Sequence, residues 1–198
     1  MISLVKGQKV DLTKGNEQLN MVTVGLGWDP VSKREQGGFF KKLKSAVVSI
    51  DCDASVFMLK NDRLESDKDI ISFTRLKSAD GSVKHSGDNL TGAGDGDDEQ
   101  IVVKLKEVPE QFNRLVFVVN IFGAKLKKQH FGLIQNAYIR IFDDRNQELI
   151  RFNLSDDYNE QTALITGEIY RHNGEWKFNA VGTGTTDATI SQLAKRYQ

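Results

Sequence analysis

The sequence has few of the features that cross-link, break or anchor a chain. Its 198 residues include one cysteine, Cys52, and two prolines. One cysteine excludes an internal disulfide and fits a reducing compartment. No apolar run approaches the roughly 18 residues that a transmembrane helix needs, and the apolar stretch at residues 2–5 is too short for a signal peptide. We therefore expect a cytoplasmic protein with no transmembrane segment.

The sequence also lacks an excess of charge of either sign. Its 27 Lys and Arg residues balance its 27 Asp and Glu residues, so no global charge favours nucleic acid as a partner. Charge is instead separated locally. Residues 87–99 hold five acids and no base, and residues 32–44 hold five basic residues and one acid. These two segments are the first candidates for function.

Alternating apolar and polar residues predict an all-β protein. The length suits one domain, residues 1–198, and Leu115–Val119, apolar at every position, predicts a central strand. Many strands and few helices favour a two-sheet β-sandwich with a C-terminal α-helix and few short helical turns. The predicted strands, rich in Val, Ile, Phe and Thr, are 2–5, 21–26, 46–59, 70–73, 101–105, 115–122, 137–142, 148–154, 163–170 and 176–181.

Three further segments have local signals. Asn173-Gly174 between two predicted strands predicts a two-residue type I′ hairpin. Apolar residues at helical spacing, Ile190, Leu193, Ala194 and Tyr197, predict the terminal helix, with Thr186 or Asp187 as its cap. Residues 76–99 show no strand pattern, and so long a segment without strands is typical of a binding loop.

The acidic segment 87–99 predicts a calcium site. Its carboxylates repel one another, a divalent cation removes that repulsion, and Ca²⁺ prefers oxygen ligands. A solvated acidic loop is the plain alternative. Asp51 and Asp53 favour the metal, because residues two apart on a strand share a face and like charges there need a counter-charge. Asp29, at the end of another predicted strand, is a third source of ligands.

Residues for other chemistry are sparse. Carboxylates on both sides of Cys52 suppress its thiolate, so we interpret this residue as core packing. The three histidines, His85, His130 and His172, share no metal spacing, which argues against zinc. His85 either supports the acidic loop or is an ordinary loop residue.

Several segments together resemble the TerD family of tellurium-resistance and bacterial stress proteins. They are 25–29, 51–55, 80–99, 131–140 and 167–178. The resemblance covers nearly the whole chain. It implies a β-sandwich that binds calcium, as two ions, and a role in stress or tellurite resistance without known catalysis. The ligands it implies are Asp51, Asp53, Asp88, Asn89, Asp95, Asp97, Asp98 and Glu99, with Asp29 less central.

The basic segment 32–44 departs from the family pattern, which is shorter and more acidic there. Its apolar and cationic residues could contact an anionic lipid surface or an acidic protein, or could simply be solvated. The candidates for an anionic-surface contact are Lys33, Arg34, Phe39, Phe40, Lys41, Lys42 and Lys44. Lys125, Lys127 and Lys128 form a second basic group open to the same interpretations.

Two functions remain open from the sequence. One is a non-catalytic calcium-binding stress-response or tellurite-resistance protein that acts through partners or membrane-associated assemblies. Its partners would be other stress proteins or an integral membrane protein. The other is a metal-dependent enzyme that acts on phosphorylated or nucleotide substrates, since Ca²⁺ or Mg²⁺ can orient phosphates.

Overall fold

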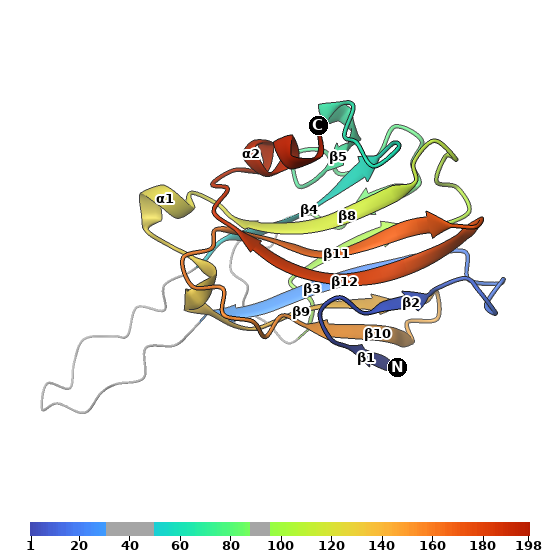
Figure 1. Cartoon of the computed structure of the whole chain (residues 1–198), viewed down its shortest axis with the longest axis horizontal. Coiled ribbons are helices and arrows are strands. Elements are labelled where there is room, and N and C mark those ends of the chain that lie inside the picture. Colours follow the sequence, from blue (N-terminus) through green and yellow to red (C-terminus); the bar gives the residue numbers. More distant parts are fainter. Residues whose placement is uncertain (31–49, 88–95) are drawn as a thin grey trace, which may run out of the picture.

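Two six-stranded sheets packed face to face make up the fold (Figure 1). The structure, a computed structural model, describes residues 1–30, 50–87 and 96–198. Within these residues the first sheet has the order β1 (Ile2–Leu4), β10 (Glu148–Asn153), β9 (Ile134–Phe142), β3 (Val22–Pro30), β7 (Glu99–Val103) and β6 (Val83–His85). The second sheet has the order β2 (Lys9–Asp11), β12 (Glu175–Thr185), β11 (Ala163–His172), β8 (Arg114–Ile121), β4 (Cys52–Leu59) and β5 (Ile70–Ile71). The predicted β-sandwich is confirmed.

The central strand β8 shows why the sequence pattern and the fold agree. It lies between β11 and β4, and its apolar residues serve two faces. Leu115 and Phe117 pack into the core between the sheets. Val116 and Val118 pack on the outer face against Leu193 of the C-terminal helix. Because both faces of β8 are covered, the strand is apolar at successive positions instead of alternating.

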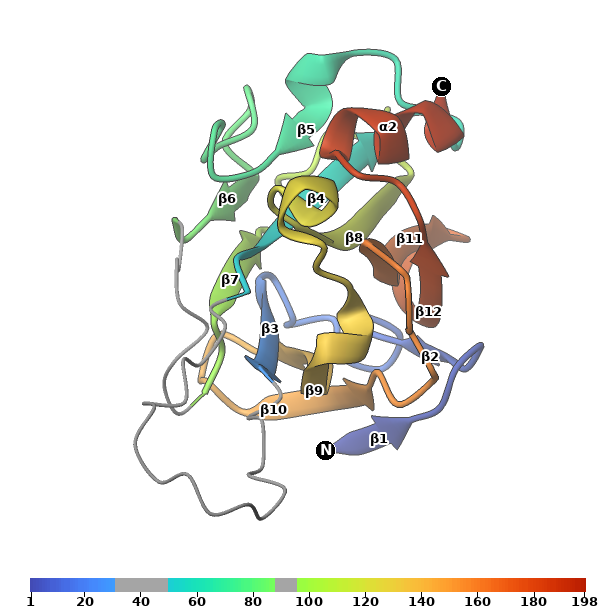
Figure 2. The same cartoon turned by 90° about the vertical axis from the view of Figure 1, so that its left-hand side faces the viewer.

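Helices are few and short. The C-terminal helix α2 (Ile190–Ala194) continues into the 3₁₀ turn η3 (Lys195–Tyr197) and covers the outer face of the second sheet (Figure 2). Its N-cap is Thr189, whose side chain accepts a hydrogen bond from the Gln192 amide, so neither predicted cap was right. The others are η1 (Asp67–Asp69), α1 (Ala124–Lys127) and η2 (Phe131–Leu133). No helix in the described parts of the chain is long and apolar enough to cross a membrane.

The turn predicted at Asn173-Gly174 is confirmed. Both residues have positive φ, 53° and 81°, as a type I′ turn requires, and the flanking residues His172 and Glu175 pair in the β11–β12 ladder.

Two strands were missed by the sequence reasoning. Strand β2 has only three residues, and β6 lies inside segment 76–99, which was predicted to contain no strand. In β6, Val83 and His85 are buried and Lys84 is exposed, so the period is that of a strand. The alternation of buried and exposed residues was not recognised, because one of the buried positions is occupied by a polar residue. His85 is a core residue and not a loop residue.

Cys52 lies in the core between the sheets with none of its surface exposed, as predicted for a packing residue. Burial raises the pKa of its thiol well above the usual value. The reactive thiolate is therefore disfavoured as well as inaccessible.

We expect the Cys52 thiol to be unreactive toward an aromatic disulfide reagent in the native protein. In denaturant the same reagent should label one thiol per chain. Absorbance of the thiolate that the reagent releases measures the labelling rate in the native and in the denatured protein. Rapid stoichiometric labelling of the folded protein would contradict this placement.

Candidate metal centre

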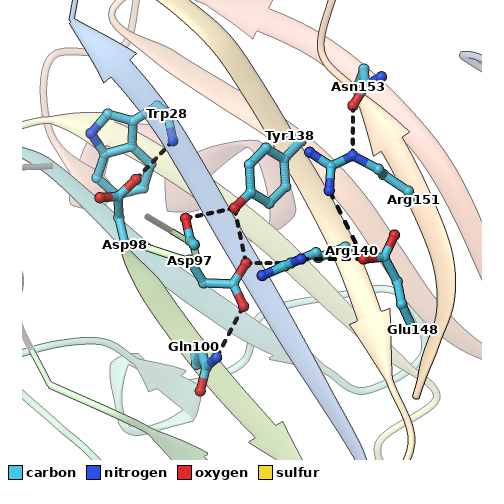
Figure 3. Close-up of polar contacts among 10 residues, drawn as sticks. Trp28, Asp97, Asp98, Gln100, Tyr138, Arg140, Glu148, Arg151 and Asn153 are labelled. Carbon is cyan, nitrogen blue, oxygen red and sulfur yellow. Dashed lines mark hydrogen bonds and ion pairs between the residues drawn. The ribbon is translucent and has the colours of Figure 1, made fainter. Parts of the chain in front are cut away.

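Segments far apart in the sequence bring carboxylates to one end of the sandwich. Strand β7 pairs antiparallel with β3 and places Glu99 opposite Leu26. Beyond that pair, the Trp28 amide donates a hydrogen bond to Asp98 Oδ2 at 2.8 Å (Figure 3). Asp98, just before β7, is therefore docked on the end of β3, close to Asp29.

Asp97 is held by a network on the outer face of the first sheet. Arg140 Nε donates to Asp97 Oδ1 at 2.6 Å, and Gln100 Nε2 donates to Asp97 Oδ2 at 2.9 Å (Figure 3). The Tyr138 hydroxyl lies 2.7 Å from the Gly96 carbonyl oxygen and 3.1 Å from Asp97 Oδ1. The Asp97 side chain is only 1% exposed. Its charge is thus neutralised by Arg140 and its position is fixed.

Two glycines of β3 make room for this network. Gly25 pairs with Arg140 across the β3–β9 ladder, and Gly27 pairs with Tyr138. A methyl group on Gly25 would overlap the Asp97 carboxylate, and one on Gly27 would overlap the Tyr138 ring. The Gly-x-Gly spacing therefore allows a carboxylate and a ring to lie directly on the strand backbone.

The carboxyl of Asp98 has a raised pKa. Burial raises its pKa to about 6, and the negative charges of Asp29, Glu99 and Asp97 act in the same direction. The hydrogen bond from the Trp28 amide opposes this shift. A carboxyl that neighbouring acids push toward its neutral form is one whose charge a cation would stabilise.

Glu99 and His85 connect the two sheets. Beside β4, the short strand β5 pairs only with Val56 and Phe57, so the polar backbone of Ala54 needs other partners. The Ala54 amide donates to Glu99 Oε2 at 2.5 Å, and the Ala54 carbonyl lies 3.0 Å from His85 Nε2. Both side chains are buried. They replace the missing strand neighbour with side-chain hydrogen bonds.

The hydrogen bonds assign the His85 tautomer. The Gly87 amide donates to His85 Nδ1 at 3.0 Å, so the ring hydrogen lies on Nε2 and points to Ala54. Glu99 Oε2 is a further 3.3 Å neighbour of Nε2. The other oxygen, Glu99 Oε1, is buried and has no hydrogen-bond partner among the described residues. It is an orphaned acceptor of the kind that a metal ion satisfies.

Asp51 and Asp53 lie on either side of the buried Cys52 in the sequence. Asp53 is 5% exposed, and Asp51 Oδ2 lies 3.9 Å from Lys127 Nζ. After burial itself, the charges of Asp53, Asp51, Glu99 and Asp98, in that order, raise the pKa of Cys52. The start of β4 and the start of β7 therefore place carboxylates close enough to act on one atom.

The structure places only part of the predicted ligand set. Asp29, Asp51, Asp53, Asp97, Asp98 and Glu99 lie at the end of the sandwich described above, where the Asn136 amide also donates to Asp29 Oδ2 at 2.9 Å. Asp88, Asn89 and Asp95 lie outside the described residues, as do the predicted anionic-surface residues Lys33, Arg34, Phe39, Phe40, Lys41, Lys42 and Lys44. Within the described ranges alone, no group of three His, Cys, Asp or Glu side chains could hold a metal ion.

Sequence reasoning missed the residues that position the acids. Arg140, Tyr138 and Gln100 hold Asp97, and each is an ordinary outward-facing strand residue in the sequence. Their role depends on the register of β9 against β3 and of β3 against β7, which no local pattern reveals. The one available signal was Gly25-x-Gly27, because glycine inside a strand indicates a close approach.

Fold and site together define a class: a two-sheet β-sandwich with an acidic cluster at one end, built where β3, β4 and β7 meet. The family model described as TerD domain matches residues 1–197. The chain belongs to the TerD family.

Named relatives match along almost the whole chain. It is 54% identical to stress response protein SCP2 of Bacillus subtilis (strain 168), over 99% of this chain and 98% of the relative. It is 43% identical to the tellurium resistance protein TerD of Serratia marcescens, over 98% of this chain and 96% of the relative. Among solved structures, a homologue of the telluride resistance protein TerD, SCO6318 from Streptomyces coelicolor A3(2), superposes with a TM-score of 0.69 at 20% identity. That match covers 91% of this chain and 98% of the other, and it supports the fold.

The fit of Asp97 against Gly25 can be tested by substitution. We expect Gly25→Ala to reduce the free energy of unfolding by about 1–3 kcal/mol, because the added methyl group forces a shift in a packed site. Urea unfolding measures the change. Thr23→Ala, on the same face of β3, is the matched control and should cost clearly less.

A double-mutant cycle identifies the cause. In an Asp97→Ala background the methyl group of Gly25→Ala no longer meets a carboxylate, so its cost should shrink. An equal cost in both backgrounds would show that the Asp97 contact is not what requires glycine.

Proposed function

We propose that this TerD-family chain is a calcium-binding stress-response protein that does not catalyse a reaction and acts through partners. The observation that carries the proposal is the convergence of carboxylates from β3, β4 and the start of β7 on one end of the sandwich. The names of the relatives, a stress response protein and a tellurium resistance protein, support the biological role.

The electrostatics of the cluster favour a divalent cation. The pKa of Asp98 is raised to about 6 by burial and by three neighbouring acids, and burial followed by the charges of four carboxylates raises the pKa of the Cys52 thiol. Coulomb repulsion of this kind is strong in a partly buried site. A bound Ca²⁺ would replace the repulsion with oxygen coordination, which it prefers at six to eight ligands.

The contacts divide the acids into two groups. Asp97 is neutralised by Arg140, so we assign it to positioning the segment and not primarily to the ion. Glu99 accepts a hydrogen bond from the Ala54 amide through Oε2, and its Oε1 is available to coordinate an ion. Together with Asp98, Asp29, Asp51 and Asp53, this oxygen would provide the described part of a centre, and Asp88, Asn89 and Asp95 would provide the rest. Two ions would use this many ligands.

Calcium would then act as a cross-link. The candidate ligands come from three segments, of which β3 and β7 pair in the first sheet and β4 lies in the second, so binding would stabilise the arrangement of the two sheets at this end and the surface that partners recognise. Expected partners are other stress proteins or an integral membrane protein. The comparisons give no support to the alternative of a metal-dependent enzyme acting on phosphorylated or nucleotide substrates.

We expect calorimetric titration to show tight Ca²⁺ binding and weak Mg²⁺ binding, because Mg²⁺ demands strict octahedral geometry. A Ca²⁺ concentration one hundred times the dissociation constant should add about 2.7 kcal/mol to the free energy of unfolding. Removing the ion with a chelator should reverse this gain.

Asp98→Asn keeps the shape of the side chain and an acceptor for the Trp28 amide but removes a charge. It should weaken Ca²⁺ binding by about tenfold or more, because affinity follows ligand charge. Asp144→Asn, at an exposed turn position, is the matched control and should bind as the unsubstituted protein does. The proposal is contradicted if titration with Ca²⁺ gives no heat of binding and Ca²⁺ does not raise the free energy of unfolding. Equal affinity for Mg²⁺ would favour the enzymatic alternative.

A further inference from the structure

A second feature lies beside the candidate metal centre and is not explained by it. Three large apolar side chains, Phe73, Phe122 and Leu126, are 38%, 54% and 93% exposed. All three line one groove of about 640 Å³, together with Ile190 at the start of α2. Exposed apolar residues that gather on one surface indicate a contact site, whereas scattered ones do not.

The same surface is basic. Residues 124–128 include Lys125, Lys127 and Lys128 and no acid, and all three lysines are exposed. Lys127 Nζ lies 5.4 Å from the centre of the Phe122 ring and 3.9 Å from Asp51 Oδ2. No described carboxylate forms an ion pair with Lys125 or Lys128. The surface therefore combines apolar side chains with positive charge.

The backbone presents this surface at one end of the molecule. The single turn α1 is capped by Gly123 before it and Lys128 after it, both in the left-handed region with φ of 70° and 51°. Figure 1 shows α1 projecting beyond the end of the second sheet, and Figure 2 views it from that end. Leu126, between two lysines of this projecting turn, is therefore largely open to its surroundings.

We infer that this surface, the α1 tip of Phe73, Phe122, Lys125, Leu126, Lys127 and Lys128, docks on an anionic lipid bilayer. Leu126 and Phe122 enter the boundary between headgroups and acyl chains, and the lysines meet lipid phosphates. Apolar residues next to lysines on one turn are the composition of interfacial membrane segments.

Two observations favour a bilayer over a protein partner. Lysine is depleted in protein–protein interfaces, yet lysines surround the most exposed apolar residue here. Leu126 is also 93% exposed, so little of its side chain packs against the groove that it lines, and it can insert into a soft surface.

The expected attachment is weak and reversible. Each basic residue near an anionic membrane contributes about fivefold to partitioning, and one short apolar turn buries little area. Binding should therefore need vesicles with a large fraction of anionic lipid and should weaken as salt is added.

Sedimentation with vesicles tests the inference on the full chain. The protein should bind vesicles of phosphatidylcholine mixed with phosphatidylglycerol and should not bind phosphatidylcholine alone. Lys125→Gln should lower the partition coefficient about fivefold, and Leu126→Ser should lower it by roughly tenfold. The matched controls are Lys84→Gln and Val5→Ser, which change an exposed lysine and a 64% exposed valine elsewhere on the molecule, and both should bind normally.

A fluorescent reporter gives an independent measurement. Leu126→Trp should show a blue-shifted emission and quenching by brominated lipids only with anionic vesicles, while the buried Trp28 and Trp176 contribute a constant background. The inference is overturned if the unsubstituted protein does not bind anionic vesicles. It is also overturned if Leu126→Ser and Lys125→Gln bind as tightly as the controls.

Discussion

The acidic end of this sandwich depends on how the backbone of Ala54 is satisfied. An edge position that lacks a strand neighbour exposes a donor and an acceptor, and burying them without partners is costly. Glu99 and His85 from the opposite sheet fill both roles at 2.5 Å and 3.0 Å. One hydrogen-bonded unit thus closes an open edge, joins the two sheets and brings the start of β7 beside the carboxylates of β4.

Contacts within the protein also hold Asp97. Its ion pair with Arg140 and its close packing on Gly25 fix the position of Asp97 without a bound ligand. A site made of acids needs some of them neutralised, since like charges in a partly buried cluster oppose folding. In this protein Arg140 neutralises one acid, and the remaining carboxylates are left to share whatever cation binds.

Acidic and basic surfaces meet at this end of the molecule. Asp51 belongs to the candidate metal centre and Lys127 to the α1 tip, and their charged atoms are 3.9 Å apart. Charges on the two surfaces can therefore influence each other at short range. The zero net charge of the sequence conceals this separation, because overall balance says nothing about where charges lie.

The sequence alone determined the fold class, the central place of β8, the 173–174 hairpin, the terminal helix and the family. Each of these depends on apolar periodicity or on short motifs, which are local properties of the chain. The sequence also identified the acids as a group, because they are concentrated in short segments of the chain. It missed β6 and the cap at Thr189, where polar residues and short length weaken any pattern.

Only the tertiary structure decided which acids are committed to structural contacts. That Asp97 meets Arg140, that Glu99 and His85 meet Ala54, and that Phe73, Phe122 and Leu126 share a groove all depend on strand register and on packing between sheets. Register changes which side chains are neighbours without changing the composition of any segment. For that physical reason the sequence could name the candidate ligands, whereas their roles followed from distances across the folded chain.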